Sequence, residues 1–87
     1  MRHARDKDLD ALEPLLRELR ALPGLSERKR GVFYRRSRAF LHFHEDPRGL
    51  FADIRDDADR EFDRMEVTTE AGRAELLALA RRRIGSV

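Results

Sequence analysis

Leucines recur at steps of three and four residues along the first quarter of the chain. They are Leu9, Leu12, Leu15, Leu16, Leu19 and Leu22. This spacing places them on one face of an amphipathic helix. Pro14 fits only the first turn of such a helix, and Pro23-Gly24 is a sequence at which helices end. We therefore expect a helix over residues about 10–22.

The pattern changes to that of β-strands between Gly31 and Arg55. Residues 31–35, 38–45 and 50–55 are rich in aromatic and aliphatic side chains, with charged or His residues between them. Arg36-Ser37 and the run from Asp46 to Gly49 separate these segments and have the lengths of tight turns. The pattern predicts a three-stranded antiparallel meander.

The last third of the chain returns to helical patterns. Acidic residues dominate the stretch from Asp56 to Asp63, and Phe62 and Met65 have a helical spacing, which predicts a short helix near residues 57–64. Thr69 is a good N-cap for a longer helix over residues about 69–84. This order predicts one α+β domain over residues 1–87, a two-layer sandwich with the N- and C-terminal helices on one sheet face.

Alternation along the strands sorts the side chains of the meander onto two faces. The face under the helices carries Val32, Tyr34, Ala39, Leu41, Phe43, Leu50, Ala52 and Ile54. The other face carries Phe33, Arg35, Arg38, Phe40, His42, His44, Phe51, Asp53 and Arg55. A shift of one residue in register would exchange the two faces. We predict that the second set forms an exposed binding face.

Three kinds of ligand suit this predicted face. Aromatic and arginine side chains anchor protein interfaces, so a homodimer or a protein partner is the first expectation. The same mixture stacks bases and holds phosphates, so nucleic acid is the alternative. A metal ion is the third candidate, because His42 and His44 project from the same face, with Asp53 or Asp46 as a further ligand. His3 is expected in a frayed start of the chain, which leaves too few histidine ligands, so no cofactor is expected.

Composition and motifs argue against several other classes of protein. Lys and Arg number 19 against 17 Asp and Glu, so the net charge is +2 and the pI of 9.7 alone does not indicate nucleic-acid binding. Without Cys there is no disulfide or thiolate site. The absence of a signal peptide and of a run of about 18 apolar residues predicts a cytoplasmic protein without a membrane partner.

The sequence gives no catalytic residue set. The five glycines are scattered and form no phosphate-binding loop. A His–Asp pair needs a nucleophile nearby to act as a triad, and Ser37, Thr68 and Thr69 fall in a predicted turn and a predicted helix cap. We expect a non-enzymatic domain.

Two resemblances accompany these patterns. The run KRGVFYRRSRAFLHFHEDPRGLFADIR, residues 29–55, resembles a small conserved family of bacterial proteins that has no established function. The first helix ending in Ala21-Leu22-Pro23-Gly24, followed by a β-meander, is similar to the MmcQ/YjbR-like fold, for which DNA binding has been suggested. This chain is shorter and lacks the later strands and helices of those proteins. Neither resemblance implies particular site residues.

Overall fold

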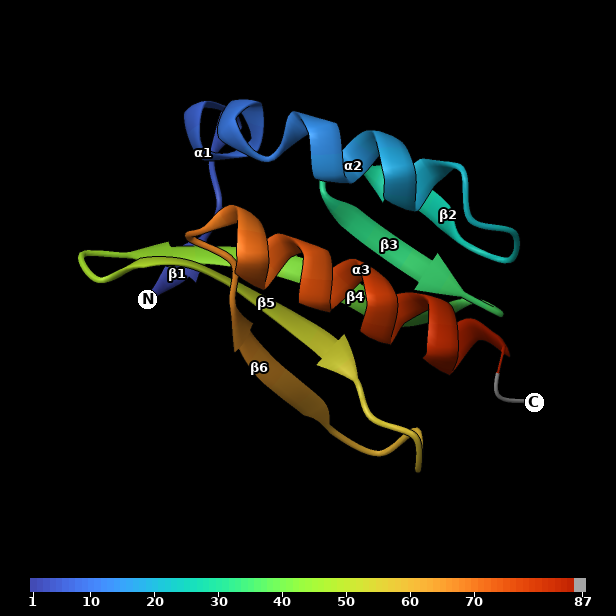
Figure 1. The fold of residues 1–87 in the computed structure, drawn as a ribbon. Helices are drawn as coiled ribbons and strands as arrows, with labels where there is room; N and C mark the ends of the chain where they lie inside the picture. The colour runs from blue at the N-terminus through green and yellow to red at the C-terminus, as the bar shows by residue number, and fades with distance from the viewer. Residues whose placement is uncertain (86–87) are drawn as a thin grey trace.

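A six-stranded antiparallel sheet and three helices make up residues 1–85, the part of the chain that the computed structural model describes (Figure 1). The helices are α1 (Asp6–Ala11), α2 (Glu13–Arg20) and α3 (Glu70–Gly85). The strands are β1 (Arg2–His3), β2 (Ser26–Lys29), β3 (Val32–Arg35), β4 (Arg38–Asp46), β5 (Gly49–Arg55) and β6 (Phe62–Glu66). The predicted α+β class is confirmed, but the sheet has six strands rather than three.

Strand β4 is the centre of the sheet. The strand order is β2-β3-β4-β5-β6, and β1 also pairs with β4. Because β5 pairs along one edge of β4, β3 and β1 share the other edge, with β3 beside residues 38–41 and β1 beside residues 44 and 45. The start of the chain is therefore part of the sheet, next to the second half of β4.

The helices lie together over one face of the sheet (Figure 1). The core between the two layers contains Leu9, Leu12, Leu15, Leu16, Leu19, Phe33, Phe40, Leu41, Phe43, Ala52, Ile54, Val67, Leu76, Leu77 and Ala80. No helix in residues 1–85 is long and apolar enough to span a membrane.

The predicted first helix is divided in two. Backbone angles at Leu12 leave the helical range, with φ −93° and ψ 0°, and α2 starts directly after it with Pro14 in its first turn. In a continuous helix the Pro14 ring would clash with the carbonyl group of Asp10. The leucines before and after this break still face the same core, which explains why their spacing looked continuous.

A β-bulge changes the predicted faces of the sheet. Phe33 pairs with Leu41 and Tyr34 pairs with Ala39, which leaves Phe40 as an extra residue in β4. The exposed fractions of Phe33 and Phe40 are 1% and 4%, so both belong to the core and neither lies on an exposed face. Strand alternation failed here because the extra residue of a bulge exchanges the inward and outward positions of one strand relative to its partner.

The predicted short helix near residues 57–64 is wrong. Residues 56–61 form a turn in which Asp59 has a φ of 59°, and β6 follows it and pairs with β5. The Asp56 carboxylate accepts the backbone N–H of Arg60, and the Asp56 N–H donates to the Glu61 carbonyl oxygen. Short acidic side chains that bind their own backbone favour turns over helix interiors.

Candidate metal centre

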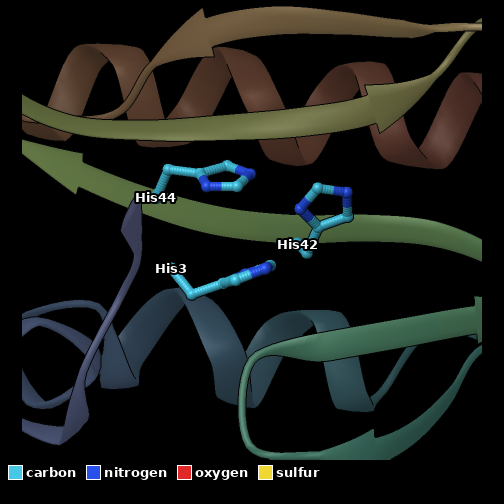
Figure 2. A group of neighbouring side chains, drawn as sticks. All are labelled: His3, His42 and His44. Atoms are coloured by element: carbon cyan, nitrogen blue, oxygen red, sulfur yellow. The ribbon is translucent and has the colours of Figure 1, made fainter. Parts of the chain in front are cut away.

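Three histidine side chains converge on the sheet face opposite the helices (Figure 2). His3 comes from β1, and His42 and His44 come from β4. His3 is the cross-strand partner of His44, and His42 lies two residues away on the same side of β4. One ring nitrogen from each residue lies within 4.8 Å of the other two. We call His3, His42 and His44 the histidine cluster.

The rings also contact one another directly. His3 stacks on His44 with ring centroids 4.9 Å apart, and His42 meets the edge of His44 at the same centroid distance. A third contact joins His3 and His42 at 5.9 Å. All three histidines of the chain therefore occupy one small region, which no local sequence motif indicates.

Strand β1 brings His3 to this site, contrary to the expected frayed start. Arg2 pairs with Glu45 in the sheet and its side chain forms an ion pair with the Glu45 carboxylate. The Ala4 N–H donates to the Phe43 carbonyl oxygen at 3.0 Å. A two-residue strand has no periodicity to detect, and the only sequence signal for His3 was that it is one of three histidines.

Buried ring nitrogens in the cluster lack hydrogen-bond partners. Nδ1 of His42 and Nε2 of His44 are inaccessible to solvent and make no hydrogen bond within residues 1–85. Burial lowers the pKa of both imidazoles, and the neighbouring His44 ring adds to this effect for His42. Lowered pKa values favour the neutral imidazole, which is the form that binds metal ions.

A charged pair borders the cluster. The Asp53 carboxylate, on a residue only 7% exposed, accepts hydrogen bonds from Nε and Nη2 of Arg64 at 2.7 and 2.8 Å. Burial raises the pKa of Asp53, but the Arg64 hydrogen bond and charge outweigh burial and hold it below its ordinary value. Asp53 is therefore a carboxylate in the folded protein, and its negative charge is shared with Arg64.

The contacts of Asp53 differ from those expected. His42 is its cross-strand partner, as predicted, but the close contact is with His44, whose Nε2 lies 3.0 Å from Oδ2 of Asp53. Nε2 of His44 nevertheless makes no hydrogen bond, so the two atoms are close but are not aligned as a hydrogen bond requires. His42 instead packs against Phe62 of β6, with ring centroids 4.9 Å apart. Arg64 and Phe62 lie at the site because residues 62–66 form strand β6, which pairs with β5.

The remaining residues of the predicted binding face are divided between separate places. Phe51 lies beside the cluster as the cross-strand partner of His44, under the guanidinium of Arg48. Arg35, Arg38 and Arg55 bind groups near the end of α3 and the β5–β6 turn, away from the histidines. Asp46, the other predicted ligand, binds Arg48 within its own turn.

The dimensions of the cluster suit an ion held by three imidazoles. Zinc–nitrogen bonds are about 2.0–2.1 Å long, so ligand nitrogens in a tetrahedral site lie about 3.3 Å apart. The largest separation here is within 4.8 Å, so the rings would need to close by about 1.5 Å at most. Three protein ligands would leave a fourth position for water or another ligand.

Comparisons of the chain with protein-family models, with curated proteins and with solved structures find no match. The function is therefore inferred from the side chains themselves.

Proposed function

We propose that this protein is a binding module that holds a divalent transition-metal ion on the open face of its sheet, through His3, His42 and His44. One observation carries the proposal: three imidazoles from two strands place ligand nitrogens within 4.8 Å of one another. Folding alone gives no reason to leave Nδ1 of His42 buried without a hydrogen bond. A bound ion would satisfy this nitrogen, while Nε2 of His44 faces the Asp53 carboxylate and leaves the other nitrogen of that ring for the ion.

The ligand types favour particular ions. Imidazole nitrogen suits Zn²⁺, Co²⁺, Ni²⁺ and Cu²⁺, whereas Ca²⁺ and Mg²⁺ prefer several oxygen ligands. The only carboxylate in contact with the cluster is that of Asp53 among the described residues, and both of its oxygens accept hydrogen bonds from Arg64. We therefore assign the site to the imidazole-binding ions.

Asp53 would orient the site rather than bind the ion. Its carboxylate lies 3.0 Å from the His44 ring, and a modest ring rotation would make this contact a hydrogen bond. Such a bond fixes which nitrogen of a ligating histidine faces the metal. Arg64 holds the carboxylate in place for this role.

The proposal is tested by NMR of the histidine rings during titration with Zn²⁺. Ring signals of His3, His42 and His44 should change together and reach their end point at one equivalent of metal. A matched substitution on the same sheet face, Glu66→Gln, should leave this behaviour unchanged. Unchanged ring signals, or changes confined to His3, would contradict the proposal.

Self-association through the same face is the second candidate function. Phe62 is 36% exposed on β6, an edge strand whose outer backbone groups have no strand partner in residues 1–85. Two copies could pair their β6 strands and cover both Phe62 rings. Light scattering should then give twice the mass of one chain, and Phe62→Ser should restore the monomer. A monomer at high protein concentration would rule this candidate out.

A further inference from the structure

A second cluster of charged side chains surrounds a cavity of about 240 Å³ at the other end of the sheet. The cavity lies among the β3–β4 turn, the β5–β6 turn and the last turn of α3. Its lining consists of Arg35, Arg36, Arg38, Ala39, Phe40, Arg55, Asp56, Asp57, Asp59 and Arg83. We call this cavity the arginine pocket.

Cations outnumber anions in the arginine pocket. Five arginines face three aspartates in the lining, and a fourth carboxylate, that of Asp63, pairs with Arg83 at 2.8 Å, so one positive charge is in excess. Asp59 pairs with Arg38 at 2.9 Å and also lies 3.5 Å from Arg55, while Asp57 lies 3.4 Å from Arg83. The Asp56 carboxylate is used by its own turn, where it accepts the Arg60 backbone N–H.

Two guanidinium groups, those of Arg35 and Arg36, have no carboxylate partner within residues 1–85. Arg35 donates to the Ile84 carbonyl oxygen. A carbonyl oxygen accepts a hydrogen bond but carries no full negative charge to balance the cation. Arg36 is exposed in the turn, and its side chain makes no hydrogen bond or ion pair within residues 1–85. The pocket therefore has donors and positive charge available to an added anion.

Backbone geometry holds these arginines together. The two turn residues, Arg36 and Ser37, have positive φ values of 54° and 69°, which gives the tight turn that places Arg35 opposite Arg38. Turns of this type usually contain Gly or Asn, so the presence of Arg36 here carries a conformational cost. Arg83 approaches from α3 and donates to the Arg55 carbonyl oxygen at 2.8 Å.

We propose that the arginine pocket binds a phosphoryl group. Planar guanidinium groups offer paired N–H donors that match the oxygens of a phosphate, and the excess of positive charge favours an anion. A free phosphate ester and the backbone of a nucleic-acid strand present this same chemistry. The site is separate from the histidine cluster and does not require a metal ion.

The test uses two-dimensional amide NMR of the whole chain with two probes, inorganic phosphate and a short oligothymidylate without a terminal phosphate. Phosphate should shift amide signals of residues 35–39 and 55–59 in a saturable way. Arg36→Ala should weaken this binding at least fivefold and should leave the fold intact, because the Arg36 side chain is exposed. Arg17→Ala on α2 removes the same charge at an exposed position and should have no effect.

The two probes distinguish the source of the phosphoryl group. If the oligonucleotide binds more tightly than phosphate and loses affinity steeply with salt, the pocket binds a nucleic-acid backbone. If phosphate alone saturates these signals, the pocket takes free phosphate groups. Shifts no larger than those from chloride at equal ionic strength with both probes would overturn the proposal, as would equal weakening by Arg17→Ala.

Discussion

The place of His3 depends on very few interactions. Strand β1 has two residues, and two side-chain contacts tie it to β4: the ion pair of Arg2 with Glu45 and the stacking of His3 on His44. Any ion bound by His3 would add to this small set of contacts, because binding and ordering of the strand are coupled. The affinity of the site should therefore respond to residues that never contact the ion.

Arg2→Ala provides this test at the level of one residue. Exposed ion pairs contribute roughly 0.2–1 kcal/mol, so the substitution should weaken Zn²⁺ binding by up to about fivefold without removing a ligand. Isothermal titration calorimetry measures the change. Arg5→Ala, a nearby loss of the same charge, should leave the affinity as it is. If the two variants weaken binding equally, net charge rather than the position of β1 is responsible.

Substitutions at Phe33 and Phe51 distinguish a residue of the core from a residue of the open sheet face. Phe33→Ala should lower the free energy of unfolding by about 3–5 kcal/mol, because its ring is fully enclosed by the core. Phe51→Ala, on the open face and only partly buried, should cost much less. Urea denaturation of both variants measures the difference. Equal, small losses would mean that Phe33 is exposed, as strand alternation predicted.

At the scale of helices and strands, Gly72 sets how closely α3 follows β6. A Cβ atom at this position would lie 2.4 Å from the carbonyl oxygen of Glu66. Replacing Gly by Ala inside a helix usually stabilises it by about 1 kcal/mol. Here the backbone at the end of β6 would have to move, so the usual gain should be reversed.

Gly72→Ala is therefore expected to destabilise the protein by about 1–3 kcal/mol, the range for overpacked sites. Thermal unfolding followed by circular dichroism gives the measurement. Gly85→Ala is the matched control, since a Cβ there meets nothing within 4 Å. A higher melting temperature for Gly72→Ala would show that α3 lies further from β6 than described.

Some elements could be predicted from the sequence, and others could not, for physical reasons. The leucine spacing and the Thr69 cap, which accepts the Gly72 N–H, identify the terminal helices. Strands β3, β4 and β5 carry apolar residues that must be buried. Strands β2 and β6 lie at the sheet edges with mostly exposed polar side chains, so no alternation distinguishes them from loops.

The candidate metal site could also be predicted only in part. His42 and His44 share a face because they are two residues apart on one strand, and this follows from the sequence. His3 and Arg64 reach the site through β1 and β6, whose pairing is decided by the tertiary structure. The bulge at Phe40 was not predicted, and for that reason the predicted binding face wrongly included two aromatic residues of the core, Phe33 and Phe40.

At the scale of the whole molecule, Glu13 joins the helical layer to the first hairpin. Its carboxylate accepts hydrogen bonds from Arg20 of α2 and from Arg30 in the β2–β3 turn. Hydrogen bonds from Arg20 and Arg30 lower the pKa of Glu13 from 4.5 to about 2. A carboxyl group with a lower pKa in the folded state contributes stability that is present above its ordinary pKa.

Acid should therefore remove this contribution as the pH falls from about 4.5 towards 2. Glu13→Gln should be less stable than the natural chain at neutral pH, and its stability should fall less over this acidic range. Urea denaturation at a series of pH values tests the expectation. Glu75→Gln, an exposed position on α3, is the control. Parallel pH profiles for all three proteins would exclude this role of Glu13.

The affinity for Zn²⁺, measured by competition with a chromophoric chelator, decides whether the histidine cluster is a metal site. Zn²⁺ is the probe because it accepts imidazole nitrogens in a tetrahedral site. If the histidine cluster holds the ion, the protein should bind one ion per chain, and both His3→Ala and His42→Ala should lose at least about tenfold in affinity. Equal affinity of the natural chain and these two variants would contradict this prediction.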